Sequence, residues 1–424
     1  MSLVSILEAA AAGGASPRAL YIHVPFCLSR CSYCDFHSFG LGADRLGAMA
    51  GKDGEYVDML LRRLESVSSM LAGNLDTIYI GGGTPTALLD KDFSRLLRGI
   101  ADRFGASGLE WTIEANPESL SQAKIEAARK AGVTRLSIGI QSMDREELLA
   151  LGRLATPESN SKALGMAATS GLDLSVDLMS AIPSLPGRTA GRRRALVGGI
   201  GAALDAGAKH ISLYDLVVEK GTGMERALAS GRLEPADPDE AYEERKEAEA
   251  YLARRGFRRY EVSNFALPGS ECRHNRVYWR MGSYLGMGSG AVSTLSSPST
   301  PQARRLEENR DLGSWIRDPD DGLMITEISP SESAFECLMM GLRTALGVDR
   351  RVFERRFGSD PALLISKTVQ KHSRCFIADE NFLRLDDRGL DILNLILVDA
   401  LSELEDSILP MRETQPRKSA EAKW

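Results

Sequence analysis

Short apolar runs rich in β-branched residues alternate with helical patterns up to about residue 265 of this 424-residue sequence. One helical segment places Val57, Leu60, Leu64 and Leu71 on a single face. Alternation of this kind is typical of parallel βαβ units with right-handed crossovers. Six units predict an α/β fold with an incomplete parallel (βα)6 barrel, although an open doubly wound sheet would satisfy the same pattern. The predicted strands are Ala19–Phe26, Asp76–Ile80, Trp111–Glu114, Arg135–Ile140, Leu174–Met179 and His210–Leu213.

The pattern changes after Phe265, and this predicts further domains. Glycines cluster between residues 282 and 290, and the Ser/Pro-rich and charged stretch 296–321 is expected to be a linker or surface excursion. Helical patterns then return, and two strand-like pieces, Phe376–Ala378 and Phe382–Leu385, flank an acidic turn. The predicted organisation is an N-terminal segment 1–18, a partial barrel 19–265, an accessory glycine-rich segment and linker 266–326, a small helical, winged-helix-like domain 327–412 and a polar, disordered tail 413–424.

The overall charge and hydrophobic pattern exclude several classes of partner. The formal net charge is −6, so no chain-wide basic field is available to hold nucleic acid or an anionic membrane. No run of about eighteen apolar residues is present, which predicts no integral membrane segment. The alanine-rich start carries Glu8 and no leading positive charge, unlike a secretory signal. We therefore expect a cytoplasmic protein.

Three of the six cysteines lie directly after the first predicted strand, at Cys27, Cys31 and Cys34. Secreted disulfide proteins spread their cysteines along the chain, so this tight triplet indicates metal chemistry in a reducing compartment. A loop of this length can bind three corners of a 4Fe–4S cube, which leaves one iron open to another ligand. Inert thiols and zinc are the alternatives. The candidate fourth zinc ligands are Asp35, His37 and Cys272.

Polar or glycine residues follow or end each of the other predicted strands. The second strand leads into Gly81-Gly82-Gly83-Thr84-Pro85, a turn that matches neither a Walker loop nor a dinucleotide-binding fingerprint. Each such residue alone is more often a turn, a helix cap or a surface group. Ligands of parallel barrels bind at the carboxyl ends of the strands, so together these residues predict a nucleoside pocket beside the cysteines. The remaining strand ends supply Glu114, Gln141, Asp177 and Tyr214.

The segment from Tyr21 to Phe36, Tyr-Ile-His-Val-Pro-Phe-Cys-Leu-Ser-Arg-Cys-Ser-Tyr-Cys-Asp-Phe, resembles the radical S-adenosylmethionine proteins. It is most similar to the branch that holds oxygen-independent coproporphyrinogen III oxidase and the HemW-like haem chaperones. The resemblance continues over nearly the whole chain, in segments 81–86, 113–118, 136–142 and 260–265. It favours an iron–sulfur cluster over zinc.

The resemblance implies roles for the residues that match the family's motifs. Cys27, Cys31 and Cys34 would ligate the cluster, whose open iron would chelate the amino and carboxylate groups of S-adenosylmethionine. In this family an electron from the reduced cluster cleaves the sulfonium and yields a 5′-deoxyadenosyl radical and methionine. The positions that match cofactor-binding residues are Tyr21, Tyr33, Gly81, Gly82, Gly83, Thr84, Glu114, Gln141, Arg153 and Asp177.

Three features separate the two branches. Phe36 stands where the oxidase has a further cysteine, and only twenty residues precede Tyr21, whereas the oxidase has a long N-terminal extension. The run from Cys272 to Trp279 also resembles the His-Asn-x-x-Tyr-Trp signature of HemW-like chains. His274 could ligate haem iron while Tyr278 and Trp279 stack on the macrocycle. The alternative is that the two aromatics anchor the second domain and His274 makes a structural hydrogen bond.

Two departures weaken the haem prediction relative to the cofactor prediction. Leu154 and Ala155 follow Gly-Arg where the family usually has a histidine, and Val292 stands where HemW-like chains often have another. We therefore predict a haem chaperone that binds a 4Fe–4S cluster and S-adenosylmethionine, with haem as a further ligand. Its expected partners are a haem acceptor protein and an electron donor. The alternatives are a coproporphyrinogen oxidase, which decarboxylates propionate side chains, and a zinc-stabilised binding protein without redox chemistry.

Overall fold

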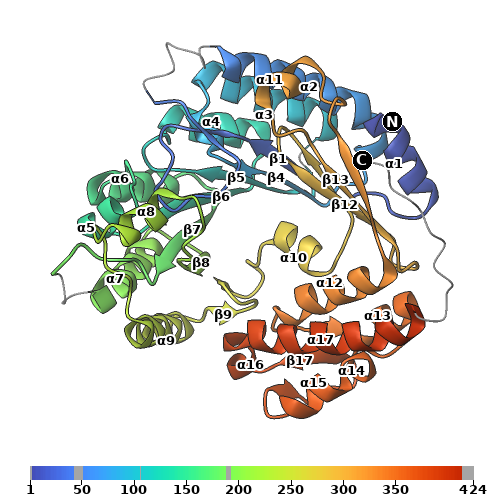
Figure 1. Ribbon diagram of the computed structural model, residues 1–424. Helices are drawn as coiled ribbons and strands as arrows, with labels where there is room; N and C mark the ends of the chain where they lie inside the picture. The colour runs from blue at the N-terminus through green and yellow to red at the C-terminus, as the bar shows by residue number, and fades with distance from the viewer. Residues whose placement is uncertain (1, 43–50, 106, 188–191, 413–424) are drawn as a thin grey trace. The chain divides into compact units, whose positions relative to one another are not determined.

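The computed structural model describes residues 2–42, 51–105, 107–187 and 192–412 (Figure 1). The predicted polar tail 413–424 lies outside these ranges. The chain divides into two compact units, which are described separately. Unit 1 contains Met1–Tyr278, Gly282–Leu295 and Arg304–Thr326, and unit 2 contains Trp279–Met281, Ser296–Ala303 and Glu327–Trp424. Two short pieces of the predicted accessory segment 266–326 therefore group with the C-terminal unit.

Six parallel strands in chain order form the centre of unit 1. In a doubly wound sheet the strand order reverses at a switch point, and no reversal occurs here. The first and last of the six do not pair with one another, so the arc stays open. The predicted incomplete barrel is confirmed. These strands are β1 (Ala19–Val24), β4 (Thr77–Gly82), β5 (Glu110–Ala115), β6 (Arg135–Gln141), β7 (Asp173–Ser180) and β8 (His210–Asp215).

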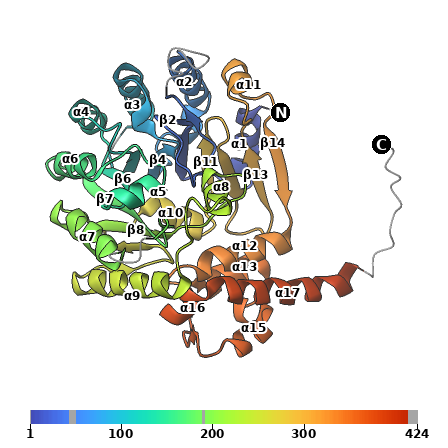
Figure 2. The same ribbon diagram turned by 60° about the vertical axis from the view of Figure 1, so that its left-hand side comes forward.

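Helices between the strands cover the outer side of the arc (Figure 2). The predicted helical stripe is confirmed, because Leu60 and Leu64 of α2 are fully buried with Ile78 and Ile80 of β4 in one core cluster. Burial of this apolar surface is the main stabilising contribution, while the inner side of the arc keeps polar side chains. The covering helices are α2 (Lys52–Leu71), α3 (Asp90–Phe104), α4 (Gln122–Ala131), α6 (Pro157–Ala168), α7 (Arg192–Asp205) and α9 (Pro238–Arg254).

Much of the predicted accessory segment and linker, 266–326, instead extends the sheet. β11 (Tyr284–Met287) pairs in parallel with β1, and β12 (Val292–Ser296), β13 (Ala303–Glu307) and β14 (Met324–Ile328) follow outward. At the other edge, β10 (Asn264–Ala266) and β9 (Arg258–Arg259) complete a sheet of twelve strands. The glycine in β11 and the two arginines in β13 hide the alternation by which strands are recognised.

A buried ion pair fastens this extension to the barrel. Arg63 of α2 contacts Glu308, just after β13, at 2.9 Å, and the two side chains are 3% and 2% exposed. The indole nitrogen of Trp315, in α11 (Leu312–Arg317), donates to the same carboxylate at 2.9 Å. Arg63 also contacts Asp320 at 2.9 Å. Buried charges are tolerated where they are paired in this way.

Unit 2 is a helical unit with a small three-stranded sheet. Its first helix, α12 (Pro330–Leu342), begins with a capping box between Ser329 and Glu332 and buries Leu338 and Leu342. The two predicted strand-like pieces are confirmed as β16 (Phe376–Ile377) and β17 (Phe382–Leu385), which join β15 (Val348–Asp349). The other helices are α13 (Arg350–Phe357), α14 (Pro361–Leu364), α15 (Ser366–Lys371), α16 (Asp387–Asp391) and α17 (Leu393–Arg412). Across the described parts of both units, no helix has the length and apolar character to span a bilayer.

Candidate cofactor site

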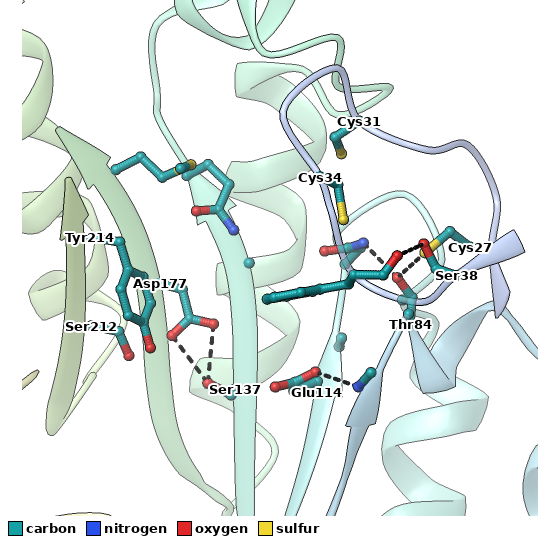
Figure 3. Close-up of a pocket in the computed structure, with 18 of the residues that line it drawn as sticks. Cys27, Cys31, Cys34, Ser38, Thr84, Glu114, Ser137, Asp177, Ser212 and Tyr214 are labelled. Carbon is teal, nitrogen blue, oxygen red and sulfur yellow. Dashed lines mark hydrogen bonds between the residues drawn. The ribbon is translucent and has the colours of Figure 1, made fainter. Parts of the chain in front are cut away.

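A cavity of about 360 Å³ opens at the carboxyl ends of the six parallel strands. Figure 3 shows the cysteine loop over one side of it and the side chains of Glu114 and Asp177 below, on strands β5 and β7. The predicted site residues are therefore largely brought together. Those that line the cavity are Cys27, Cys31, Cys34, Tyr33, Gly82, Gly83, Thr84, Glu114, Gln141, Arg153 and Asp177.

The cysteine loop is held at both its ends and its middle. β2 (Phe26–Cys27) pairs in parallel with β3 (Phe39–Gly40), which closes the base of the loop. In the middle, the Ser32 N–H donates to the carbonyl of Leu151 at 3.0 Å. The Ser32 carbonyl in turn accepts from the N–H of Met224 at 2.7 Å, in α8 (Gly223–Ala229). Segments that follow β6 and β8 thus fix the position of a loop that follows β1.

The three thiols are free and suited to a metal cluster. Burial raises the pKa of the Cys27 thiol to about 11, so this cysteine stays protonated unless a cation replaces the proton. In the described residues, no group of three or more His, Cys, Asp or Glu side chains is arranged to hold a single metal ion. A 4Fe–4S cube needs its thiolates spaced around it, which three cysteines on one loop can provide.

A chain of polar contacts connects two of the cysteines along the cavity wall. The Cys27 sulfur lies 3.5 Å from the Thr84 hydroxyl, which accepts from the Asn116 amide at 2.8 Å. The Asn116 carbonyl oxygen accepts from Arg153 at 3.1 Å, and Arg153 reaches the Cys31 sulfur at 3.7 Å. Sequence analysis missed Asn116, although it lies two residues after Glu114. The guanidinium of Arg153 therefore links the cavity wall to the cysteine loop.

The triple-glycine turn is required by close packing within the protein. A Cβ on Gly82, whose φ is +109°, would lie 2.5 Å from Nδ1 of His23. A Cβ on Gly83 would lie 2.8 Å from the backbone nitrogen of Phe26. The amides of Gly83 and Thr84 donate to Val24 and Phe26 carbonyls at 2.9 and 2.7 Å. These two donors are therefore satisfied within the protein.

Two carboxyl groups with raised pKa values lie in the cavity wall. Burial raises the pKa of Glu114 to about 7, although Tyr79 donates to it at 2.7 Å and the N–H of Gly82 at 3.2 Å. Burial also raises the pKa of Asp177, which lies 3.4 Å from the hydroxyl of Ser137. Both residues can accept hydrogen bonds, and a bound cation would favour their ionised forms.

The remaining predicted cofactor residues differ in their placement. Gln141 has a left-handed backbone, with φ of +64°, beside a register shift in β6, and such conformations cluster at functional sites. Tyr33 packs against a small apolar cluster that includes Leu216 and Met224. Tyr21 and Gly81 do not line the cavity. The Tyr21 hydroxyl instead lies 2.9 Å from Nδ1 of His23, so the prediction that it contacts the cofactor directly is not supported by this geometry.

The predicted haem residues do not form a haem site. His274, in α10 (Arg273–Trp279), is fully buried, and burial lowers its pKa to about 3. Its Nδ1 lies 2.8 Å from the Thr77 hydroxyl and its Nε2 lies 2.7 Å from the Tyr278 hydroxyl. Neither nitrogen is available to iron, so the structural hydrogen bond that the sequence left open is the observed role. Trp279 belongs to unit 2, whereas the other two residues belong to unit 1.

Two family models match parts of this chain. Residues 21–196 match the radical SAM superfamily and residues 328–392 match the HemN C-terminal domain. The solved structure of coproporphyrinogen III oxidase HemN from Escherichia coli superposes with a TM-score of 0.75, covering 96% of this chain and 94% of that chain. At 19% identity, this likeness shows the fold alone.

Curated relatives identify the branch. Heme chaperone HemW of Synechocystis sp. is 34% identical over 78% of this chain and 79% of its own length. HemW of Escherichia coli is 34% identical over 70% of this chain and 79% of its own. The mitochondrial radical S-adenosyl methionine domain-containing protein 1 of Bos taurus is 32% identical over 93% of this chain and 90% of its own. The chain therefore belongs to the HemW family of radical S-adenosylmethionine proteins.

Proposed function

We propose that this protein is a haem chaperone that carries a 4Fe–4S cluster and S-adenosylmethionine and passes haem to an acceptor protein. The observation that carries the proposal is the cysteine loop of a HemW-family chain placed over a polar cavity at the carboxyl ends of parallel strands. Relatives in this family carry the name heme chaperone. A haem acceptor protein and an electron donor are the partners that this function requires.

Cys27, Cys31 and Cys34 would hold the cluster as three thiolates. The fit is supported by three free thiols on one loop and by the guanidinium of Arg153 at 3.7 Å from Cys31. A cube with three protein ligands keeps one iron for the amino and carboxylate groups of S-adenosylmethionine. When bound, the reduced cluster supplies the electron that cleaves the sulfonium.

The cavity wall would hold the rest of the cofactor. Glu114, Gln141 and Asp177 offer acceptors for ribose hydroxyls and for positive charge. The amides of 82–84 are already engaged, so this turn would contribute its carbonyl oxygens and the Thr84 hydroxyl to the amino-acid end. Arg153 and Tyr33 would close the side next to the cysteine loop. Tyr21 would act through His23, which packs against Gly82.

A haem titration tests the chaperone. Anaerobically reconstituted protein should bind haem saturably, seen as a shifted Soret band against a cluster-loaded baseline, and should release it to apomyoglobin. The same preparation, incubated with coproporphyrinogen, reductant and S-adenosylmethionine, should form no decarboxylated product. Product formation would identify an oxidase, and the lack of saturable haem binding would contradict the chaperone.

A further inference from the structure

The mouth of the cavity differs in character from its interior. Two apolar residues that line the cavity are strongly exposed, Phe36 at 64% and Val217 at 66%, whereas Tyr214 lies beside Ser212 and Asp177 (Figure 3). We call Phe36 and Val217 the rim. The interior wall instead carries polar groups such as Glu114 and Asp177. Exposed apolar groups next to a polar cleft mark a binding surface for a ligand that is itself apolar.

The loops that carry the rim are tied together. Phe36 lies in the cysteine loop, two residues after Cys34, and Val217 lies in the segment after β8. The hydrogen bond from the Met224 N–H to the Ser32 carbonyl, at 2.7 Å, joins these two segments. Leu216, next to Val217, is buried in the same apolar cluster as Met224. The rim side chains therefore project from an anchored surface, which reduces the ordering cost of binding.

We propose that the haem macrocycle lies against the rim formed by Phe36 and Val217, outside the S-adenosylmethionine pocket. This inference rests on the proposed function, because it takes haem as the ligand. A flat porphyrin can cover exposed aromatic and aliphatic side chains while its edge stays in water. Arg30 is exposed and lines the same cavity, so it can pair with a propionate.

The rim also explains how a chaperone could give haem away. Of the described residues that line the cavity, one is a histidine, His210, and its nitrogens lie 2.8 Å from the Ser175 and Tyr260 hydroxyls. The cavity therefore supplies no free imidazole for iron. Haem held against the rim by one face leaves the iron accessible from its other face to a ligand from the acceptor, so transfer need not first break a strong iron–protein bond.

Haem titration of reconstituted rim variants tests this placement. The Phe36→Ser, Val217→Ser double variant should bind haem about tenfold more weakly, because it loses apolar contact area. The matched control is Leu149→Ser, since Leu149 is 62% exposed, lies in α5 (Arg145–Ala150) and does not line the cavity. The control should bind haem like the wild type. Iron and sulfide content confirms that each variant keeps its cluster.

The outcomes separate the placement from the function. If the wild type binds haem saturably and the double variant binds it equally well, haem lies elsewhere. This result would refute the rim proposal but not the chaperone function. If the wild type does not bind haem, both the rim proposal and the chaperone function are refuted. Should the double variant lose its cluster, the near-isosteric Val217→Thr replaces it; about threefold weaker binding supports the rim, and unchanged binding overturns it.

Discussion

The cavity wall and the packing around His274 both place polar side chains inside unit 1, but they differ in what remains available to a ligand. Each ring nitrogen of His274 faces a hydroxyl of the protein, Thr77 on one side and Tyr278 on the other. Glu114 and Asp177 also have partners, yet both line an open cavity of about 360 Å³. Buried polar residues therefore divide into scaffold and site by access, not by residue type.

Cys31→Ser gives the largest expected effect at the cavity. We expect iron and sulfide uptake to be lost, because two thiolates cannot hold the cube, while the melting temperature changes little since the residue is in a loop outside the core. Cys375→Ser, in unit 2, is the matched control and should keep full iron content. Stoichiometric zinc with no iron in wild-type protein prepared anaerobically would refute the assignment.

Arg63→Met gives the strongest test of the buried polar groups that stabilise the fold. Removal of the guanidinium leaves the Glu308 carboxylate buried without its cation, 2% exposed. We expect the free energy of unfolding to fall by about 3–5 kcal/mol, measured by denaturant titration. Lys52→Met, which breaks an exposed ion pair with Glu55, is the control. It should lower the free energy of unfolding by at most about 1 kcal/mol. Equal effects of the two variants would show that the extension is not fastened by this pair.

His274→Ala tests directly whether His274 stabilises the fold or binds haem. The variant leaves the Thr77 and Tyr278 hydroxyls without their partner and opens a void, so we expect a loss of about 2–4 kcal/mol in unfolding free energy. Haem affinity of the folded variant should be unchanged. Loss of haem binding with stability intact would restore His274 as a haem ligand.

The smallest expected effect concerns pH. Because burial raises the pKa of Glu114 to about 7, cofactor binding below pH 7 must displace a proton, and affinity for S-adenosylmethionine should rise by up to about tenfold per pH unit as pH approaches 7. Glu114→Gln should flatten this profile, measured by calorimetry in buffers of matched ionic strength. Tyr79 and Asp177 face the same carboxyl, and burial raises the pKa of both, which keeps Tyr79 protonated in this range. A profile that persists in the variant would therefore move the titration to Asp177.

The raised pKa also affects the folded protein without its cofactor. The unfolded chain ionises Glu114 near its ordinary pKa of 4.5, whereas the folded chain does so near 7. Its contribution to stability is therefore complete below pH 4.5 and is lost as pH rises through 7. Glu114→Gln should be more stable than the wild type above pH 7 in thermal unfolding.

Much of the fold could be predicted because each of the six parallel strands is a short apolar run with its own helix. The cysteine loop could be predicted from spacing alone, since its ligands are close in sequence. β11 could not, because Gly286 packs against the backbone of Val292 and leaves no alternating pattern to read. The roles of Asn116 and His274 depend on hydrogen bonds to residues far away in the sequence. A single sequence does not show which residues these are.

The bond between Met224 and Ser32 also bears on how the protein is made. The cysteines leave the ribosome early, but the segment that fixes the middle of their loop is synthesised only after β8. A nascent chain that stops before this point has its thiols but lacks the support that spaces them. Insertion of iron and sulfide should therefore be a late event in biogenesis, after nearly all of the parallel strands have formed.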